Sequence, residues 1–313
     1  MSPRVASCLL LGLTGLAETP RAFGQGAASL PPVRFHAEAG LEPVAERLAS
    51  GPGLRTALPA MPAFPEGMDP VDVWIVRDLA TLADLGLGPA EDWVAGVADP
   101  STNRIGLRAA RGVGSAGELG PVLRHELAHV ALAAVTGGRA PAWLDEGYAQ
   151  YASGSWGYGD AWTLRLLLLR GERIGLRRVA LGFRRGEAEA RVAYLLSYTA
   201  VHSLFERGGE KGVAKLLSAL GRGESLDAAL RIALRTTEAR FERQWREDVR
   251  ARYGWLFVLS RASAFWLLAG LFLVAVVSLR RRRDRRRLAA LDEVSAEPWT
   301  DSGDWLWDDE DEV

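Results

Sequence analysis

Short alternating runs of apolar and polar residues dominate the first third of the chain. Strand-like runs cover residues 33–37 (VRFHA), 71–76 (VDVWIV), 94–98 and 104–108. The last two runs flank the sequence DPSTN, whose Asp, Pro and Asn are typical of a turn, so they predict a hairpin. Residues 43–50 are predicted to form a helix after the first strand.

From residue 158 onward the apolar positions recur at helical spacing. The predicted helices cover residues 160–170, 187–207, 209–220, 225–234 and 237–252. In the last of these, Thr237 is a good N-cap and Phe241, Trp245 and Val249 form one stripe. A small strand-rich half followed by a helical half predicts an α+β fold.

A further helix between these halves carries Leu119, Leu123, Leu127 and Val130 on one apolar face. Its start is left open, either at Ser115 with a capping box or at Gly120 before Pro121. It ends at the pair Gly137-Gly138, and Pro141 opens the next helix, PAWLDEGYAQYAS. The sequence therefore predicts two consecutive helices joined by a tight reversal.

Both ends of the chain carry apolar runs. Residues 5–17 form a run of 13 that is too short to cross a bilayer and suits the core of a signal peptide, which is predicted over residues 1–24. An uncleaved anchor is the alternative. Residues 262–279 form 18 residues without a charge, about 27 Å as a helix, and seven arginines follow within residues 280–287. This second run predicts one transmembrane helix.

The positive-inside rule then orients the chain. The arginine flank and the acidic tail, residues 280–313, are predicted to be cytoplasmic, with a disordered tail that is open to a cytoplasmic partner. Residues 25–254 are predicted to form the outer domain, periplasmic or extracellular, at a bacterial cytoplasmic membrane.

The composition excludes some classes of partner and of metal site. The chain has 313 residues, 48% of them hydrophobic and 25% charged, which fits a folded protein. A formal net charge of −1 argues against a nucleic-acid partner. Cys8 is the only cysteine, so neither an internal disulfide nor a cysteine-based zinc site can form.

The sequence HELAH places His125 and His129 four residues apart on one helical face, away from the apolar stripe. Two imidazoles at this spacing can bind one tetrahedral Zn²⁺. Glu126 stands beside the first ligand, where it can act as general base toward a water activated by zinc. Glu146, on the next helix, can supply the third ligand because the reversal at Gly137-Gly138 turns that helix back.

HELAH followed by PAWLDEGYAQY resembles the gluzincin metallopeptidases, and specifically the peptidase MA-like group, whose second helix typically reads W-x-x-E-G-x-A. Here that pattern falls on Trp143, Glu146, Gly147 and Ala149. The resemblance extends over residues 33–248, with the two zinc helices as its most specific part. It implies a zincin-like fold, with a hairpin strand that lines the substrate cleft.

The resemblance also implies a hydrogen-bond donor for the oxyanion of the tetrahedral intermediate. Tyr194 and Tyr198 lie one helical turn apart in the segment expected to supply it, and Tyr198 is the favoured candidate. Asp145 could orient a ligand histidine or simply face solvent. His36 and His202 are expected to be structural or surface residues.

We therefore expect a membrane-anchored metallopeptidase with one zinc ion that hydrolyses peptide or protein substrates outside the cytoplasm. No aminopeptidase motif such as G-x-M-E-N occurs in the sequence, so an endopeptidase is expected. The alternative is a non-catalytic scaffold of the same fold that binds partners at the membrane. Glu126 distinguishes the two, because a scaffold has no need of a general base.

Overall fold

The computed structural model describes residues 30–87, 95–109, 116–170, 174–183 and 185–295. The chain divides into two compact units, Met1–Trp255 and Leu256–Val313, and the first, called the domain below, holds the candidate site. The predicted signal peptide, residues 1–24, lies outside the described residues. Residues 296–313 of the predicted tail do so as well.

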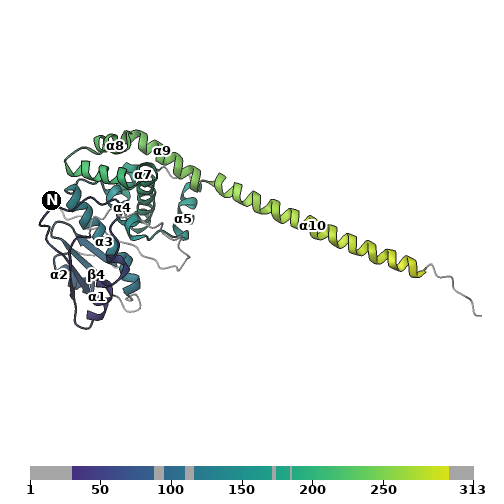
Figure 1. Ribbon diagram of the computed structural model, residues 1–313, viewed down its shortest axis with the longest axis horizontal. Coiled ribbons are helices and arrows are strands. Elements are labelled where there is room, and N and C mark those ends of the chain that lie inside the picture. The colour runs from purple at the N-terminus through teal and green to yellow at the C-terminus, as the bar shows by residue number, and fades with distance from the viewer. Residues whose placement is uncertain (1–29, 88–94, 110–115, 171–173, 184, 296–313) are drawn as a thin grey trace, which may run out of the picture. The chain divides into compact units, whose positions relative to one another are not determined.

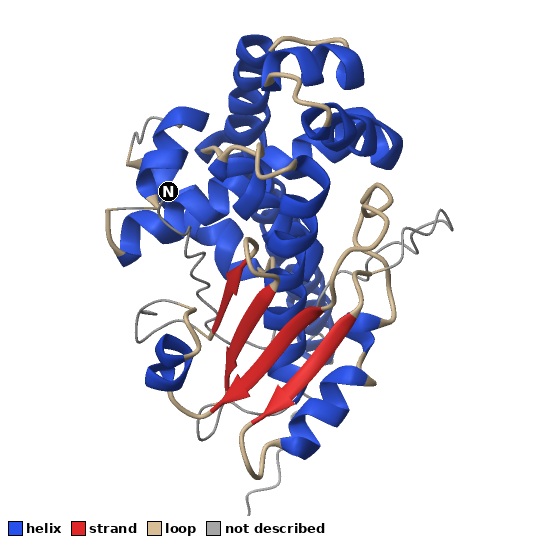
Figure 2. Cartoon of the chain, turned by 90° about the vertical axis from the view of Figure 1, so that its left-hand side faces the viewer, coloured by secondary structure: helices blue, strands red, loops and turns tan. Residues whose placement is uncertain are grey.

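Four strands form one sheet in the order β1-β2-β4-β3. Their bounds are β1 (Val33–Ala37), β2 (Val71–Val76), β3 (Gly96–Asp99) and β4 (Arg104–Arg108). β1, β2 and β4 run parallel, whereas β3 pairs antiparallel with β4 as the predicted hairpin. Figure 2 shows the four strands at one end of the domain, with most of its helices at the other. Three strands match their predicted bounds, and β3 begins two residues later than predicted.

Three short helical elements connect the first strands. They are α1 (Glu42–Ala49), the 3-10 helix η1 (Pro52–Leu54) and α2 (Leu79–Asp84). Only α1 was expected from the sequence. On one face of the sheet, α2 places Leu82 against Gly106 of β4, where a β-carbon would lie 2.4 Å from the Leu82 Cδ2 atom.

The long helix α3 (Ala116–Thr136) lies between the sheet and the helical half. Its predicted apolar stripe packs against the sheet in one core cluster, which includes Val73 of β2 and Ile105 of β4. Its other side joins the helical core through Ala128 and Leu132. The start predicted before Pro121 is wrong because this proline lies inside the helix. The other predicted start, Ser115, lies outside the described residues.

The helical half consists of α4 (Ala142–Ser153), α5 (Tyr158–Leu169), α6 (Leu176–Gly182), α7 (Glu187–Gly221), α8 (Leu226–Leu234) and α9 (Glu238–Tyr253). Figure 1 labels α4, α5, α7, α8 and α9 of this half. Its core includes Trp143 of α4 and the α9 residues Phe241 and Trp245. The Trp143 and Phe241 rings stack at a centroid distance of 6.0 Å. The two helices predicted over 187–207 and 209–220 form one element with a kink at Gly209, whose φ is +58°.

The second unit contains α10 (Trp255–Ser295). Its described side chains include exposed apolar residues from Phe265 to Leu279. No helix within the described ranges is long and apolar enough to cross a membrane. The transmembrane helix predicted over residues 262–279 is therefore not found there, and the side chains of residues 255–264, which include its first turn, are not among those described.

Candidate metal centre

Packing of α3 on the sheet fixes which way its histidines point. With the apolar stripe held against the strands, His125 and His129 face α4 instead, and both side chains are 1% exposed. Their Nε2 atoms lie 3.1 Å apart, and the rings meet edge to face. One face of α3 thus aims two imidazole nitrogens at the same point, as the four-residue spacing predicts.

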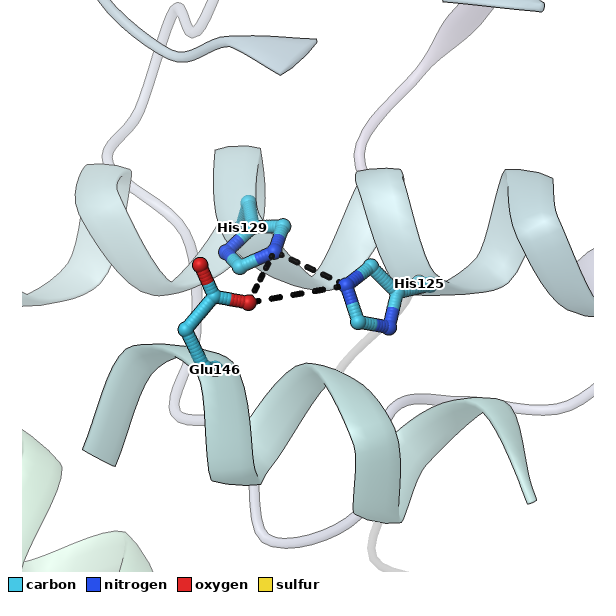
Figure 3. Close-up of side chains that lie close together, drawn as sticks. All are labelled: His125, His129 and Glu146. Carbon is cyan, nitrogen blue, oxygen red and sulfur yellow. Dashed lines mark hydrogen bonds and ion pairs between the residues drawn. The ribbon is translucent and has the colours of Figure 1, made fainter. Parts of the chain in front are cut away.

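Glu146 reaches this point from the first turns of α4. The reversal between the helices uses Gly137 and Gly138, whose φ angles of +61° and +70° are costly for other residues. The Glu146 Oε2 atom lies 3.5 Å from the His129 Nε2 atom and 3.8 Å from the His125 Nε2 atom. Figure 3 shows the three side chains converging from the two helices. The structure thus brings the three predicted ligands together.

The three residues, called the triad below, are suited to a metal ion. One ligand atom from each lies within 4.8 Å of the others, and all three residues are buried. Two imidazole nitrogens and one carboxylate oxygen form a donor set typical of catalytic zinc, which takes three protein ligands and keeps one position open. Within the described residues, the His125 Nδ1 and Glu146 Oε2 atoms have no hydrogen-bond partner. Buried polar atoms are rarely left unpaired, so a bound cation would explain the Glu146 oxygen.

The electrostatics of the triad also favour a positive charge. Burial alone would lower the pKa of His129, but the carboxylates of Asp145 and Glu146 outweigh burial and raise it well above its ordinary value. Burial lowers the pKa of His125, and the neighbouring His129 lowers it further. The site thus stabilises one cation between these groups, and a metal ion can take that place.

Asp145 holds one of the histidines in place. Its Oδ1 atom lies 2.9 Å from the His129 Nδ1 atom, on the side of the ring away from the triad. A carboxylate that accepts a hydrogen bond from Nδ1–H fixes the tautomer and leaves the Nε2 lone pair free for a metal. Of the two interpretations left open by the sequence, the structure supports an orienting role for Asp145.

Glu126 is fully buried beside the edge strand β3. Neither carboxylate oxygen has a hydrogen-bond partner among the described residues. Burial raises the pKa of Glu126 to about 8, and the neighbouring carboxylates of Glu146 and Asp145 add to this effect against the opposing charge of His129. A pKa raised from 4.5 toward neutral pH increases the affinity of this carboxylate for a proton, which favours its use as a general base once it is ionised.

Gly96 of β3 provides the space for this carboxylate. A β-carbon at residue 96 would lie 3.0 Å from the Glu126 Oε1 atom and 2.6 Å from the Val122 Cγ1 atom. The absence of a side chain at this position lets α3 approach β3 with Glu126 directed at the strand. Sequence reasoning did not single out Gly96, and its only signal was a glycine at the start of the hairpin.

Arg124 of α3 and Tyr148 of α4 anchor these helices to η1 and the segment after it. Arg124 donates from Nε to the Ala152 carbonyl of α4 at 2.6 Å and from its terminal nitrogens to the carbonyls of Gly53, Thr56 and Ala57. Tyr148 donates to the Pro59 carbonyl at 2.7 Å. Arg124 therefore ties α3 directly to α4. Sequence reasoning missed it, because an arginine that binds only backbone carbonyls leaves no partner signal in the sequence.

Tyr198 lies in a different group of side chains. Its ring stacks on Trp156 at 4.3 Å and lies 5.9 Å from the His202 ring. No contact between Tyr198 and the triad is present within the described part of the chain. Its role as oxyanion donor stays a prediction, as does that of Tyr194, whose ring packs edge to face on Phe183.

The profile of the Peptidase MA superfamily matches residues 65–251, which is more than half of the 313-residue chain. This match includes β2, the β3–β4 hairpin and both helices of the triad. A search of curated proteins gives no match.

Proposed function

The chain belongs to the peptidase MA superfamily and is a zinc metallopeptidase; we propose that it cleaves internal peptide bonds with Glu126 as its general base. The observation that carries this proposal is the buried triad with Glu126 beside it, all on α3 and α4. The triad residues fit one zinc ion, with His125, His129 and Glu146 as its ligands.

Zinc held by the triad would supply a Lewis acid that lowers the pKa of water and polarises a peptide carbonyl. Glu126 would take the proton from the attacking water at a carboxylate oxygen and then deliver it to the leaving amine. Its burial supports both transfers, because hydrogen bonds from solvent do not compete for the carboxylate. Asp145 would keep the His129 ring oriented throughout.

The edge strand supports cleavage within a polypeptide. β3 pairs only with β4 among the described strands, so its outer edge offers backbone groups beside Glu126. An extended peptide can add to such an edge as a further strand, with residues on both sides of the scissile bond. That arrangement accommodates an internal peptide bond without requiring a free terminus.

Digestion of a mixed peptide library by the purified full chain tests this function. We expect cleavage at internal bonds that a zinc chelator stops and added zinc restores. The His129→Ala variant, purified in parallel, controls for a contaminating peptidase and should be inactive. Equal cleavage by both proteins, or cleavage only of terminal residues, would contradict the proposal. Retained zinc without any cleavage would favour the scaffold instead.

We also propose that the protein is held at a bacterial cytoplasmic membrane, with the domain outside the cytoplasm. The support is in the sequence, where the apolar residues 262–279 precede the seven arginines of residues 280–287. Protease added to cells with an opened outer envelope should digest the domain and spare the C-terminal tail. Extraction of the full chain by alkaline carbonate, without detergent, would argue against a membrane span.

A further inference from the structure

One face of α5 exposes large apolar side chains to solvent. Trp162, Leu166 and Leu169, called the α5 stripe below, are 55%, 52% and 59% exposed. Their spacing of four and three residues places them on one side of the helix. Leu164, on the opposite side, is fully buried in the helical core. One face of α5 therefore packs into the domain core, and a second apolar face is exposed to solvent.

The chain segment that contains the stripe is basic. The described residues between 158 and 185 carry five arginines (165, 170, 177, 178 and 185) and one acidic residue, Asp160, although the whole chain has a net charge of −1. The Arg165 guanidinium lies over the Trp162 ring at 5.3 Å, and Arg170, which follows the helix, is exposed. The positive charge is thus a local property of this segment.

The position of α5 in the domain connects the stripe with the end of α9. α5 packs against α9, and Trp156, just before α5, contacts the Tyr253 ring at 6.1 Å. Burial raises the pKa of Tyr253, and the charges of Arg252 and Arg165 oppose this rise. Tyr253 is the last residue of α9, so the start of α5 lies beside the C-terminal end of that helix.

We propose that the α5 stripe rests on the surface of an anionic lipid bilayer. Exposed Trp and Leu side chains flanked by arginine are the composition of helices that lie in a membrane interface, with apolar side chains among the acyl chains and guanidinium groups at the phosphates. Arg170, Arg177 and Arg185 are exposed in this segment, and anionic headgroups offer them an opposite charge that a neutral apolar partner lacks. This contact goes beyond the proposed peptidase activity and does not depend on it.

Spin labels on the full chain can test the contact directly. In a Cys8→Ser background, a single cysteine is placed at Leu166 or, as a matched control, at Ile232 of α8, which is 50% exposed. The labelled proteins are combined with vesicles of phosphatidylcholine alone or with added phosphatidylglycerol. Collisions of the label with oxygen and with a water-soluble nickel complex report its depth.

With phosphatidylglycerol present, we expect the label at residue 166 to become several-fold less accessible to nickel and more accessible to oxygen. The label at residue 232 should stay in water. Arg170→Glu should reverse part of the change at residue 166. Equal accessibility at both sites, failure of the chain to associate with the anionic vesicles, or immersion that is equal in both lipids would overturn the proposal. If, without vesicles, the label at residue 166 became less accessible to nickel as the protein concentration rose, the stripe would be a site of self-association and the proposal would be wrong.

Discussion

Two histidine–aspartate pairs in this molecule have almost the same geometry and very different surroundings. The His129 Nδ1 atom lies 2.9 Å from the Asp145 Oδ1 atom, and the His36 Nε2 atom lies 2.8 Å from the Asp72 Oδ1 atom. The His129 side chain is 1% exposed, whereas the His36 side chain is 31% exposed. A hydrogen bond from histidine to carboxylate is therefore no sign of a functional site by itself.

The difference lies in the groups that surround each ring. For His129 that atom faces His125 and Glu146, and no other group of potential ligands with this geometry occurs in the described residues. The His36 ring instead stacks on Trp74 at 4.2 Å, and Asp72 also pairs with Arg34. The surface pair is thus neutralised by its neighbours, whereas the buried pair leaves a position for a cation.

The largest expected effect comes from Glu126→Gln. The amide keeps the size of the side chain but cannot take a proton, so cleavage should fall by about 10²–10⁴-fold. The metal content should not change, because the three ligands are untouched. Cleavage rates and metal content measured together check this expectation, with Asp72→Asn as the matched change at the surface pair. Cleavage at the wild-type rate by Glu126→Gln would remove Glu126 from the mechanism.

Gly96→Ala should also lower the rate of cleavage, but by less than Glu126→Gln. The added methyl group would press on Glu126 and Val122 and displace the carboxylate, and a shift of about 1 Å can cost up to about 10²-fold in rate. We expect a lower kcat with zinc retained. Gly106→Ala is the control, because its methyl group meets Leu82 on the α2 side and should reduce stability without slowing catalysis in the folded protein. Equal loss of kcat in both variants would indicate general damage to the sheet.

Asp145→Asn should weaken metal binding without abolishing it. Loss of a carboxylate that orients a histidine ligand typically lowers metal affinity by about 10–100-fold. Competition with a chelator of known zinc affinity measures this change, and the tautomer of His129 can be followed by NMR. Unchanged affinity and tautomer would show that Asp145 only faces solvent. Asp72→Asn should leave zinc affinity as in the wild type.

The smallest effect is expected at the surface pair itself. Exposed ion pairs contribute less than about 1 kcal/mol, so Asp72→Asn should lower the free energy of unfolding by no more than that. The hydrogen bond from His36 lowers the pKa of Asp72 in the folded state. This contribution is therefore fully present above the unfolded carboxyl pKa of about 3.9 and is lost as pH falls from there through the lower pKa of the folded state. Urea unfolding of both proteins from pH 3 to 7 should show the difference only at the upper end.

The sequence was most informative where spacing alone determines geometry. His125 and His129 share a face because residues four apart on a helix always do, and the apolar stripe beginning at Leu119 fixes where that face points. The reversal at Gly137-Gly138 then places Glu146, as predicted. Three strands also match their predicted bounds, since alternation and turn residues mark them clearly.

Features that depend on packing between distant segments could not be predicted in this way. Gly96 makes room for Glu126 because α3 lies against β3. Arg124 holds its position through backbone carbonyls around residues 53–57. Neither relation has a periodic signature in the sequence. The stacking of Tyr198 on Trp156 likewise depends on how α7 meets the loop after α4, which helical spacing does not determine.

Zinc content is the measurement that most directly tests the difference between the His129–Asp145 and His36–Asp72 pairs. The full chain, His129→Ala and His36→Ala are each supplied with zinc, dialysed and analysed for bound metal. Because His129 of the buried pair belongs to the triad and His36 does not, we predict about one zinc ion per chain in the wild type and in His36→Ala, and none in His129→Ala. A wild-type chain that holds no zinc, or a His129→Ala chain that keeps it, would contradict the assignment of the triad as the metal centre.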